Sequence, residues 1–506
     1  MTALSTPIAD WIVVLPVVLA LLGAALLLMP MRSRLPLGGL AILVTAAICA
    51  NDVLLFMRVF ADGPLAMTMG KWLPPFGISF SADVMGAAFA LAGAFVTLVV
   101  LFYLAVGEPR GDREQGLYPL ILLLLAGISG AFLTGDLFNL YVWFEVMLIA
   151  SFGLLAGGGR AIQLDATVKY GFLNFLATTL FLMALGLLYG LLGTLNMADI
   201  ALSAPKAAPA AMAGIGALFL LAFGTKAAAF PVNTWLPASY HAPPAALSAL
   251  LAGLLTKVGV YALLRTLVAL LPGARETLEP AIAVIAIATM LLAPLGAIAE
   301  TNLRRAIGFM VIGGIGIALS GLALPSQAGL AGATLYVFHA ILTMTALYLV
   351  AGLAEKLTGE TDSRRMGGLY AASAPVSILF LVAVLAASGV PPFLGFWPKL
   401  LLLQAGAGNA GLVGIALVVA LLVNALLTLI AGTRLWAHIF WRQKPDRAVP
   451  PAVSAGLASV PAAILVAAIV LAGLWPDLPV AAANAAASGL IDPAQYIAAV
   501  GLGGAP

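Results

Sequence analysis

Long apolar runs separated by short polar stretches follow one another along the whole chain. A helix crosses the hydrocarbon core of a bilayer in about 20 apolar residues, so each run of this length predicts a membrane-spanning helix. Such runs lie near residues 9–29, 36–57, 83–106, 117–134, 137–157, 170–194, 211–235, 245–271, 279–298, 303–324, 330–353, 371–404, 411–438 and 454–475. The pattern predicts an all-α polytopic membrane protein with 14 transmembrane helices, and an even number places both termini on one side of the membrane.

The composition supports a chain that lies almost entirely in lipid. Hydrophobic residues make up 63% of the 506 residues and charged residues 8%, whereas soluble domains carry about 25% charged residues. Of the 23 lysines and arginines, 15 fall in one set of alternating loops and four (Arg58, Lys71, Lys206 and Arg275) in the opposite set. Because cytoplasmic loops are enriched in basic residues, both termini are expected outside the cytoplasm.

The same composition excludes several classes of function. The net charge of +3 is small and scattered, which argues against a nucleic-acid partner. Cys49 is the only cysteine, so neither an intrachain disulfide nor a four-cysteine iron–sulfur cluster can form, and the three histidines are scattered without metal-site spacing. No phosphate-binding loop of the form GxxxxGK[ST] occurs, so we expect no ATP-driven transport and no cofactor.

Ionisable residues within the apolar runs are the candidates for function. Glu145 lies eight residues into the run at 137–157, within TGDLFNLYVWFEVMLIASFG, which is about 12 Å deep at about 1.5 Å per residue. A charge near the bilayer centre costs at least about 2.5 kcal/mol on insertion scales, so such residues usually mark an ion pathway. The alternative for Glu145 is a neutral, hydrogen-bonded carboxyl that only holds helices together. Four basic residues also fall inside predicted helices: Lys226, Lys257, Arg265 and Lys399.

Two of these lysines lie beside expected helix breaks. Lys226 precedes Pro231 in LAFGTKAAAFPVNTWLP, and Lys399 follows several glycines and prolines in LAASGVPPFLGFWPKLLLL. Non-helical backbone at membrane depth is tolerated where it lines protein or a watery cavity, although Lys226 could instead extend to the interface. Paired interrupted helices in two halves of a chain point to the ion site of an inverted-repeat transporter, with helices 4–8 and 9–13 as the repeats.

Two further candidates lie between these breaks. Lys257 shares one helix face with Tyr261 and Arg265 in ALLAGLLTKVGVYALLRTL. His339 lies in the middle of its run, LYVFHAILTMTAL, with Thr343 one turn later. An unperturbed histidine pKa near 6.5 suits a proton relay, and the alternative is a histidine that only satisfies its own hydrogen bonds in the core.

Three segments that contain these residues resemble a known family. They are TGDLFNLYVWFE (134–145), GTKAAAFPVNTWLPASYHAPPAALSALLAGLLTKVGVYALLR (224–265) and SGVPPFLGFWPKLLL (388–402). The chain resembles, over about residues 80–440, the proton-translocating family shared by Mrp-type sodium/proton antiporters and the antiporter-like subunits of respiratory complex I and membrane hydrogenases. Within the family, LLTKVGVYALLR and KYGFLNFLATTLFLMALGLLYG are most similar to the D-type subunits of Mrp antiporters.

The resemblance implies a fold and a set of roles. The expected parts are helices 1–3 in residues 1–116, a first inverted repeat in 117–272, a second in 279–440, and helix 14 with the tail in 441–506, with helices 7 and 12 discontinuous. The implied proton relay consists of the helix-5 glutamate Glu145, its partner Lys226, the connecting Lys257, the helix-11 residue His339 and the terminal Lys399. The chain would be an ion transporter subunit rather than an enzyme, in a bacterial inner membrane, with protons, sodium and other membrane subunits as partners.

The resemblance also suggests a mechanism. A desolvated lysine loses proton affinity and a nearby carboxylate restores it, so an ion pair between Glu145 and Lys226 that forms and breaks would drive a proton toward Lys257 and on through His339 to Lys399. One alternative is a proton-pumping subunit of a complex I-type oxidoreductase or membrane hydrogenase, and another is a self-contained secondary transporter.

Two pairs of adjacent residues do not fit these expectations. Thr343 and Met344 stand where relatives often carry a lysine, so the second half of the relay would pass through His339 and water alone. Asn51 and Asp52 lie inside or near the end of the second apolar run, and we interpret them as a helix boundary rather than as a lipid-shielded contact to a partner subunit.

Overall fold

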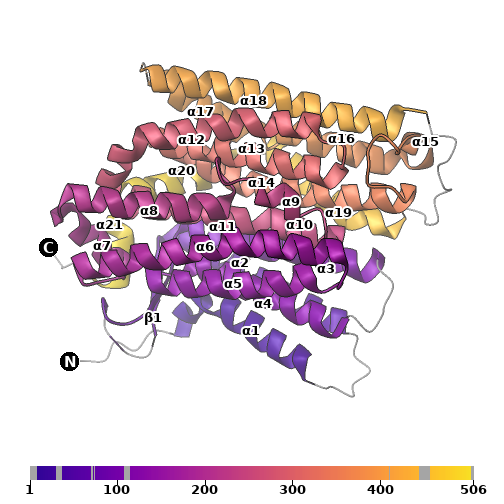
Figure 1. Cartoon of the computed structure of the whole chain (residues 1–506). Helices are drawn as coiled ribbons and strands as arrows, with labels where there is room; N and C mark the ends of the chain where they lie inside the picture. Colours follow the sequence, from indigo (N-terminus) through magenta and orange to yellow (C-terminus); the bar gives the residue numbers. More distant parts are fainter. Residues whose placement is uncertain are drawn as a thin grey trace.

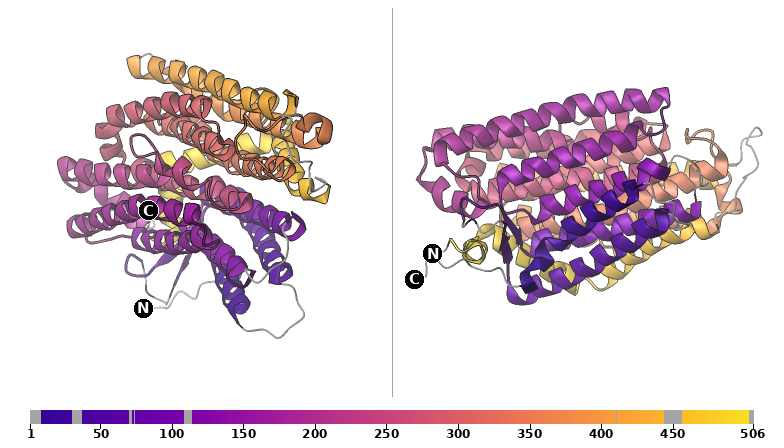
Figure 2. Two further views of the ribbon diagram at one scale, coloured as in Figure 1. Left: turned by 45° about the vertical axis from the view of Figure 1, so that its right-hand side comes forward. Right: turned by 90° about the horizontal axis from the view of Figure 1, so that it is seen from below.

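The computed structural model describes residues 8–29, 37–69, 72, 74–107, 114–409, 411–443 and 456–502. In this part of the chain, 12 helices are long and apolar enough to cross a membrane, and Leu15–Leu28 and Ala374–Ser388 are shorter apolar helices. The helices run side by side along the long axis of the molecule (Figures 1 and 2). The prediction of a largely helical, polytopic membrane protein is confirmed.

The first 206 residues contain the elements that precede the first broken helix. Its elements are η1 (Ile8–Val13), α1 (Leu15–Leu28), α2 (Leu37–Asp62), β1 (Leu65–Thr68), β2 (Ser79–Ala82), α3 (Val84–Gly107), α4 (Glu114–Leu133), α5 (Leu137–Ala156), α6 (Ala161–Leu192), α7 (Met197–Ser203) and η2 (Ala204–Lys206). The antiparallel pair β1–β2, with Leu65 opposite Ala82, was not predicted. η1 and the C-terminal helix α21 (Ala494–Val500) both contact β1, so the first and last described elements lie at one end of the bundle (Figure 1).

The next segment contains the first broken helix and an unbroken but irregular one. α8 (Pro209–Ala227) is followed by irregular backbone and the short α9 (Trp235–Ser239), as the proline spacing predicted. The following helix consists of α10 (Ala245–Leu250), the π-helical η3 (Leu251–Leu255), α11 (Thr256–Leu264) and the π-helical η4 (Arg265–Leu270). Residues 245–270 are completely enclosed by the rest of the protein.

The C-terminal half has the second broken helix. Its elements are α12 (Pro272–Ala299), α13 (Leu303–Ala323), α14 (Gln327–Thr358), α15 (Leu369–Ala372), α16 (Ala374–Ser388), α17 (Phe396–Gly408), α18 (Leu412–Trp436), η5 (Ala437–Trp441), η6 (Leu457–Ser459), α19 (Val460–Leu474), α20 (Asp477–Ile491) and α21. The break between α16 and α17 lies within the predicted run at 371–404. α20 and α21 were not predicted, and α19 and α20 both pack along α14 and α3.

The bundle is organised around two buried helices, the irregular helix at residues 245–270 and α14. α14 packs against α10, α13, α16, α17, α19 and α20, and η3 and α11 also contact it. In contrast, α2, α6 and α18 bury only about a third of their most apolar segments, since they lie at the periphery. Lys257, Arg265 and His339 lie on these two helices, whereas Lys226 and Lys399 lie on α8 and α17, which pack against them.

One boundary prediction is wrong. Asn51 and Asp52 do not end their helix, because α2 continues to Asp62 and buries both side chains among its neighbours.

The predicted excess of basic residues in alternate loops rests in part on residues outside the described part of the chain, namely Arg32, Arg34, Lys71, Arg110, Arg113, Lys444 and Arg447.

Candidate functional site

Glu145 lies on α5, whose start is fixed by Asp136. The Asp136 carboxylate accepts a hydrogen bond from the Asn139 backbone N–H at 2.8 Å, which caps the helix. Glu145 is half-buried, and it lies on the same helix face as the exposed side chains of Val142 and Ile149. It is therefore nearer the edge of this chain than its depth in the apolar run implied.

Lys226 lies in the last turn of α8, immediately before the break. The helix ends at Ala228, whose φ of +60° is left-handed, and the Trp235 indole donates to the Thr225 carbonyl at 3.0 Å. The ammonium of Lys226 is buried and lies 5.5 Å from the centre of the Phe144 ring. Glu145 acts on it electrostatically without forming an ion pair. The two groups are thus close enough to interact but not in contact.

Lys257 lies just after the π-helical turn of η3. Its Nζ donates to the Ala252 carbonyl at 2.6 Å, five residues earlier, and its side chain is fully buried. A π-helical turn widens the backbone spacing and is frequent at functional sites. Here the lysine bonds to a neutral carbonyl of its own irregular helix.

The helices that carry Lys226 and Lys257 cross closely. A Cβ at Gly259 would lie 2.8 Å from the backbone nitrogen of Ala227, so only glycine permits this approach without a shift. Gly253 of η3 makes a similar close approach to Thr345 and to the Ile341 carbonyl of α14. These two crossings connect α8 to the helix of Lys257, and that helix to α14.

His339 lies in the centre of α14 and is completely buried. Its Nδ1 shares a 3.1 Å hydrogen bond with the Thr343 hydroxyl, while its Nε2 has no partner within the described residues. A Cβ at Gly395, in the second break, would lie 2.8 Å from Nε2, so the free nitrogen faces that break. Lys257 and Lys399 both lie close enough to His339 to act on it electrostatically.

Lys399 lies on α17, after the second break. Its Nζ reaches back across the break and donates to the carbonyls of Ala387 at 3.1 Å and Ser388 at 2.6 Å, the last residues of α16. The C-terminus of a helix carries partial negative charge, so a cation is favoured there. Lys226 precedes its break and Lys399 follows its break, so the two lysines approach the breaks from opposite sides.

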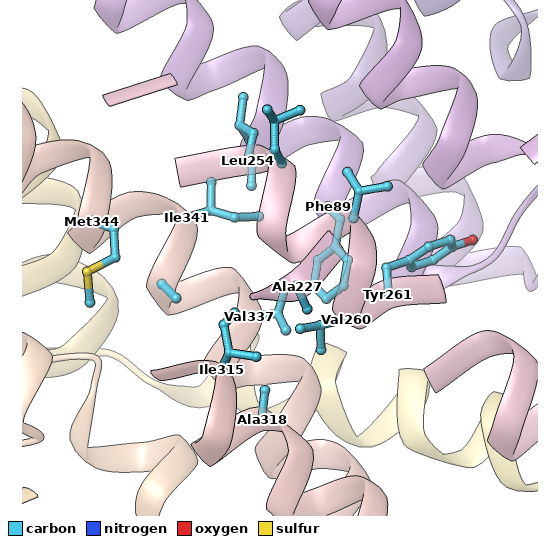
Figure 3. Close-up of a cluster of buried hydrophobic side chains, with 14 of the residues drawn as sticks. Phe89, Ala227, Leu254, Val260, Tyr261, Ile315, Ala318, Val337, Ile341 and Met344 are labelled. Carbon is cyan, nitrogen blue, oxygen red and sulfur yellow. The ribbon is translucent and has the colours of Figure 1, made fainter. Parts of the chain in front are cut away.

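Apolar side chains surround the central part of this row. Figure 3 shows apolar side chains from α3, α8, η3, α11, α13 and α14 packed together, among them Ala227, Leu254, Val260, Val337 and Ile341, which are close in sequence to Lys226, Lys257 or His339. Electrostatic interactions are stronger in such surroundings than in water. The five predicted residues lie on five elements, α5, α8, α11, α14 and α17.

The ion pair of Arg265 and the part that Asp83 plays in it were not predicted from the sequence. Arg265 forms a 2.6 Å ion pair with Asp83, and the same guanidinium lies 5.4 Å from the ring of Tyr261. Asp83 precedes α3 and accepts from the Gly86 N–H at 2.8 Å, so its position in SADVMG resembles a helix cap, which is the only sequence signal that it gives.

The chain is similar to known proteins in sequence and in fold. Residues 134–428 match the family model described as NADH:quinone oxidoreductase/Mrp antiporter, TM. The chain is 35% identical to the D subunit of the Na(+)/H(+) antiporter of Bacillus subtilis over 96% of this chain and 99% of that protein. It is also 35% identical to the protein of the same name from Alkalihalophilus pseudofirmus, over 89% of this chain and 91% of that protein. Among solved structures, a chain of the Mrp complex from Dietzia sp. matches with a TM-score of 0.90 and 29% identity, covering 98% of this chain and 100% of that one.

Proposed function

Because the chain belongs to the NADH:quinone oxidoreductase/Mrp antiporter family, we propose that it is the subunit of a sodium/proton antiporter that moves protons along the row from Glu145 to Lys399. Relatives named as antiporter D subunits match it over nearly their whole length. They support an ion transporter rather than a catalytic enzyme.

The observation that carries this proposal is the way in which the three lysines are held. Lys257 and Lys399 donate to backbone carbonyls, and Lys226 lies over an aromatic ring. None of the three forms an ion pair within the described part of the chain. A buried cation without a carboxylate partner is costly, so each of these groups can give up its proton more readily than a paired lysine.

The Glu145–Lys226 pair is the proposed switch. When the carboxylate approaches Lys226 it stabilises the ammonium, and when it withdraws, burial favours loss of the proton. An arrangement without the ion pair, like the one described above, would be the open state of this switch. The released proton would pass to Lys257 across the crossing at Gly259, and then through His339 to Lys399.

We propose the remaining topology on the same grounds. The 12 long apolar helices, together with α1 and the α16–α17 pair, give the 14 transmembrane helices expected from the sequence. Residues 117–272 and 279–440 would be the two inverted repeats, each with one broken helix. The excess of basic residues in alternate loops supports a topology with both termini on the non-cytoplasmic side of the bacterial inner membrane.

The proposed complex contains other membrane subunits. Glu145 lies beside Val142 and Ile149, which are 38% and 62% exposed in the isolated chain. A partner subunit that covered this face would exclude lipid and water from the switch and link it to events elsewhere in the complex.

Expression with and without the flanking genes tests the proposed function. The assay is sodium-dependent proton movement in inside-out vesicles from a strain that lacks its own sodium/proton antiporters. We expect activity only when the flanking genes are co-expressed. Activity of the chain alone would favour a self-contained transporter, and proton movement that depends on NADH or hydrogen instead of sodium would favour a redox-driven pump.

A further inference from the structure

α2 carries an acid that the proposed row of proton carriers does not use. Asp52 lies in the middle of α2, and its side chain is 0% exposed. Its Oδ1 accepts one long hydrogen bond of 3.5 Å from the Asn51 amide, and its Oδ2 has no partner within the described residues. An ionised carboxylate with so little compensation is costly in the interior of a membrane protein, so the surroundings suit the neutral acid.

The helices around α2 offer Asp52 no compensating charge among the side chains that the structure describes. α1, α3 and α4 pack against α2. The other described ionisable side chains of these elements and of η1 are Asp10, Cys49, Arg58, Asp62, Tyr103 and Tyr118. The one cation in this set, Arg58, is already paired with Asp10 at 2.8 Å. The Tyr118 hydroxyl lies against Gly38, at the opposite end of α2 from Arg58.

A strip of polar atoms connects Asp52 to the end of the molecule where η1 lies. The Asp10–Arg58 pair is partly exposed, and Arg58 also donates to the Ala9 carbonyl at 2.7 Å. The Asn51 amide donates to the Ile12 carbonyl at 3.0 Å and reaches the Asp52 carboxyl. The strip therefore leads from a surface ion pair, along the backbone of η1, to the buried acid.

Two buried hydroxyls of α2 and α4 have no hydrogen-bond partner in the described part of the chain. Thr45 is two turns earlier on the same face of α2, and its Oγ1 has no hydrogen-bond partner there. Ser129 of α4 also has a buried, unpartnered hydroxyl.

The register of α2 and α4 places Ser129 at the level of Asp52. Gly38 lies against Tyr118, and Ile48 clusters with Leu125 and Ala126, so the two helices run in the same direction. One further turn on each helix leads to Asp52 and Ser129. Asp52 thus has a polar route toward η1, and it shares the interior of the α2–α4 region with two buried hydroxyls that have no partner in the described part of the chain.

We propose that Asp52 is a second exchangeable proton-binding site, which exchanges its proton through the strip formed by Asn51, η1 and the Asp10–Arg58 pair. Its contribution to transport rests on the proposed antiporter function, whereas the binding of a proton at Asp52 does not. Asp62, on the same helix but exposed, provides a matched control.

The first test is chemical and needs no transport. Dicyclohexylcarbodiimide reacts with protonated carboxyls in apolar surroundings, so the whole complex in native membranes is treated with it and digested for mass spectrometry. We expect an adduct on Asp52 that decreases as the pH rises and is absent in Asp52→Asn, with no adduct on Asp62. If Asp52 remains unlabelled across the pH range, the proposal is overturned.

The second test separates proton exchange from a structural role. Asparagine keeps the size and hydrogen bonding of aspartate but cannot exchange a proton, so Asp52→Asn should lower antiport about tenfold with unchanged assembly. Asp52→Glu should retain most activity, and Asp62→Asn all of it. Wild-type transport in Asp52→Asn would overturn the proposal. If Asp52→Asn does not assemble, Asp52→Glu and the labelling result decide.

Glu145→Ala, measured in parallel, keeps the two proposals apart. Lost transport in Glu145→Ala with wild-type transport in Asp52→Asn contradicts only the role of Asp52. Retained transport in Glu145→Ala contradicts the proposed row, whatever the result for Asp52.

Discussion

The three buried lysines are held by groups that carry no formal charge. Lys257 and Lys399 use carbonyls that a π-helical turn and a helix end leave available, and Lys226 uses an aromatic ring. Arg265, two turns after Lys257, is instead paired with Asp83. An arginine is always protonated, so this pair has a structural role, whereas the unpaired lysines are suited to change their protonation.

Thr343 is hydrogen-bonded to His339 one turn earlier on the same helix. Its hydroxyl is the only hydrogen-bond partner of the histidine ring within the described residues. We predict that Thr343→Val lowers antiport about tenfold, because the ring loses its fixed orientation, while Thr343→Ser stays near wild type. Vesicle antiport at equal protein amounts measures this. Full activity in Thr343→Val would mean that His339 needs no such support.

The Asp83–Arg265 pair is predicted to stabilise the fold. Removing one member leaves the other charge buried and unpaired, so Asp83→Asn or Arg265→Met should each cost about 3–5 kcal/mol of stability. The double variant should be more stable than either single one. The thermal midpoint of the purified complex is the measurement, and additive losses in the double variant would argue against direct coupling.

Single residues show where sequence interpretation succeeded and failed. Glu145 and the lysines stood out because charge is rare within apolar runs. Asp83 could not be found in this way, since its partner Arg265 is far along the chain and nothing local indicates the pair. Asp52 was misinterpreted because two adjacent polar residues look like a helix end, whereas the structure buries them between neighbouring helices.

At the level of elements, the helix breaks were predictable and the π-helical turns were not. Proline and glycine mark the breaks after α8 and α16 because they disrupt helical backbone. The run LLAGLLTKVGVYALLRTL has no proline, and its π-helical turns depend on packing against neighbouring helices.

The close crossing of the helices α8 and α11 leads to a prediction about proton transfer between them. A larger side chain at Gly259 would push against the backbone of Ala227 and separate the helices of Lys226 and Lys257. We predict that Gly259→Leu lowers antiport about 100-fold, because proton transfer depends steeply on separation. Gly214→Leu, on α8 with open space beside it, is the matched control. Equal effects of the two substitutions would contradict the role of the crossing.

At the scale of the whole molecule, the orientation in the membrane is a prediction from charge alone. In a Cys49→Ser background, Lys206→Cys should react with an impermeant thiol reagent added outside intact cells, and Arg364→Cys should react only after permeabilisation. The reverse pattern would invert the proposed topology. The long apolar helices were predictable because hydropathy reports them directly, but the two helices after α19 were not, because α20 is rich in alanine rather than in larger apolar residues.

The central claim is that protons move through the row that begins at Glu145 and Lys226. The most direct measurement is sodium-driven proton antiport in inside-out vesicles that contain the complete complex with Glu145→Ala, Lys226→Ala or the control Lys206→Ala, an exposed lysine. We predict that the first two variants assemble normally but lose antiport, and that the control retains it. Wild-type antiport in either Glu145→Ala or Lys226→Ala would contradict the account.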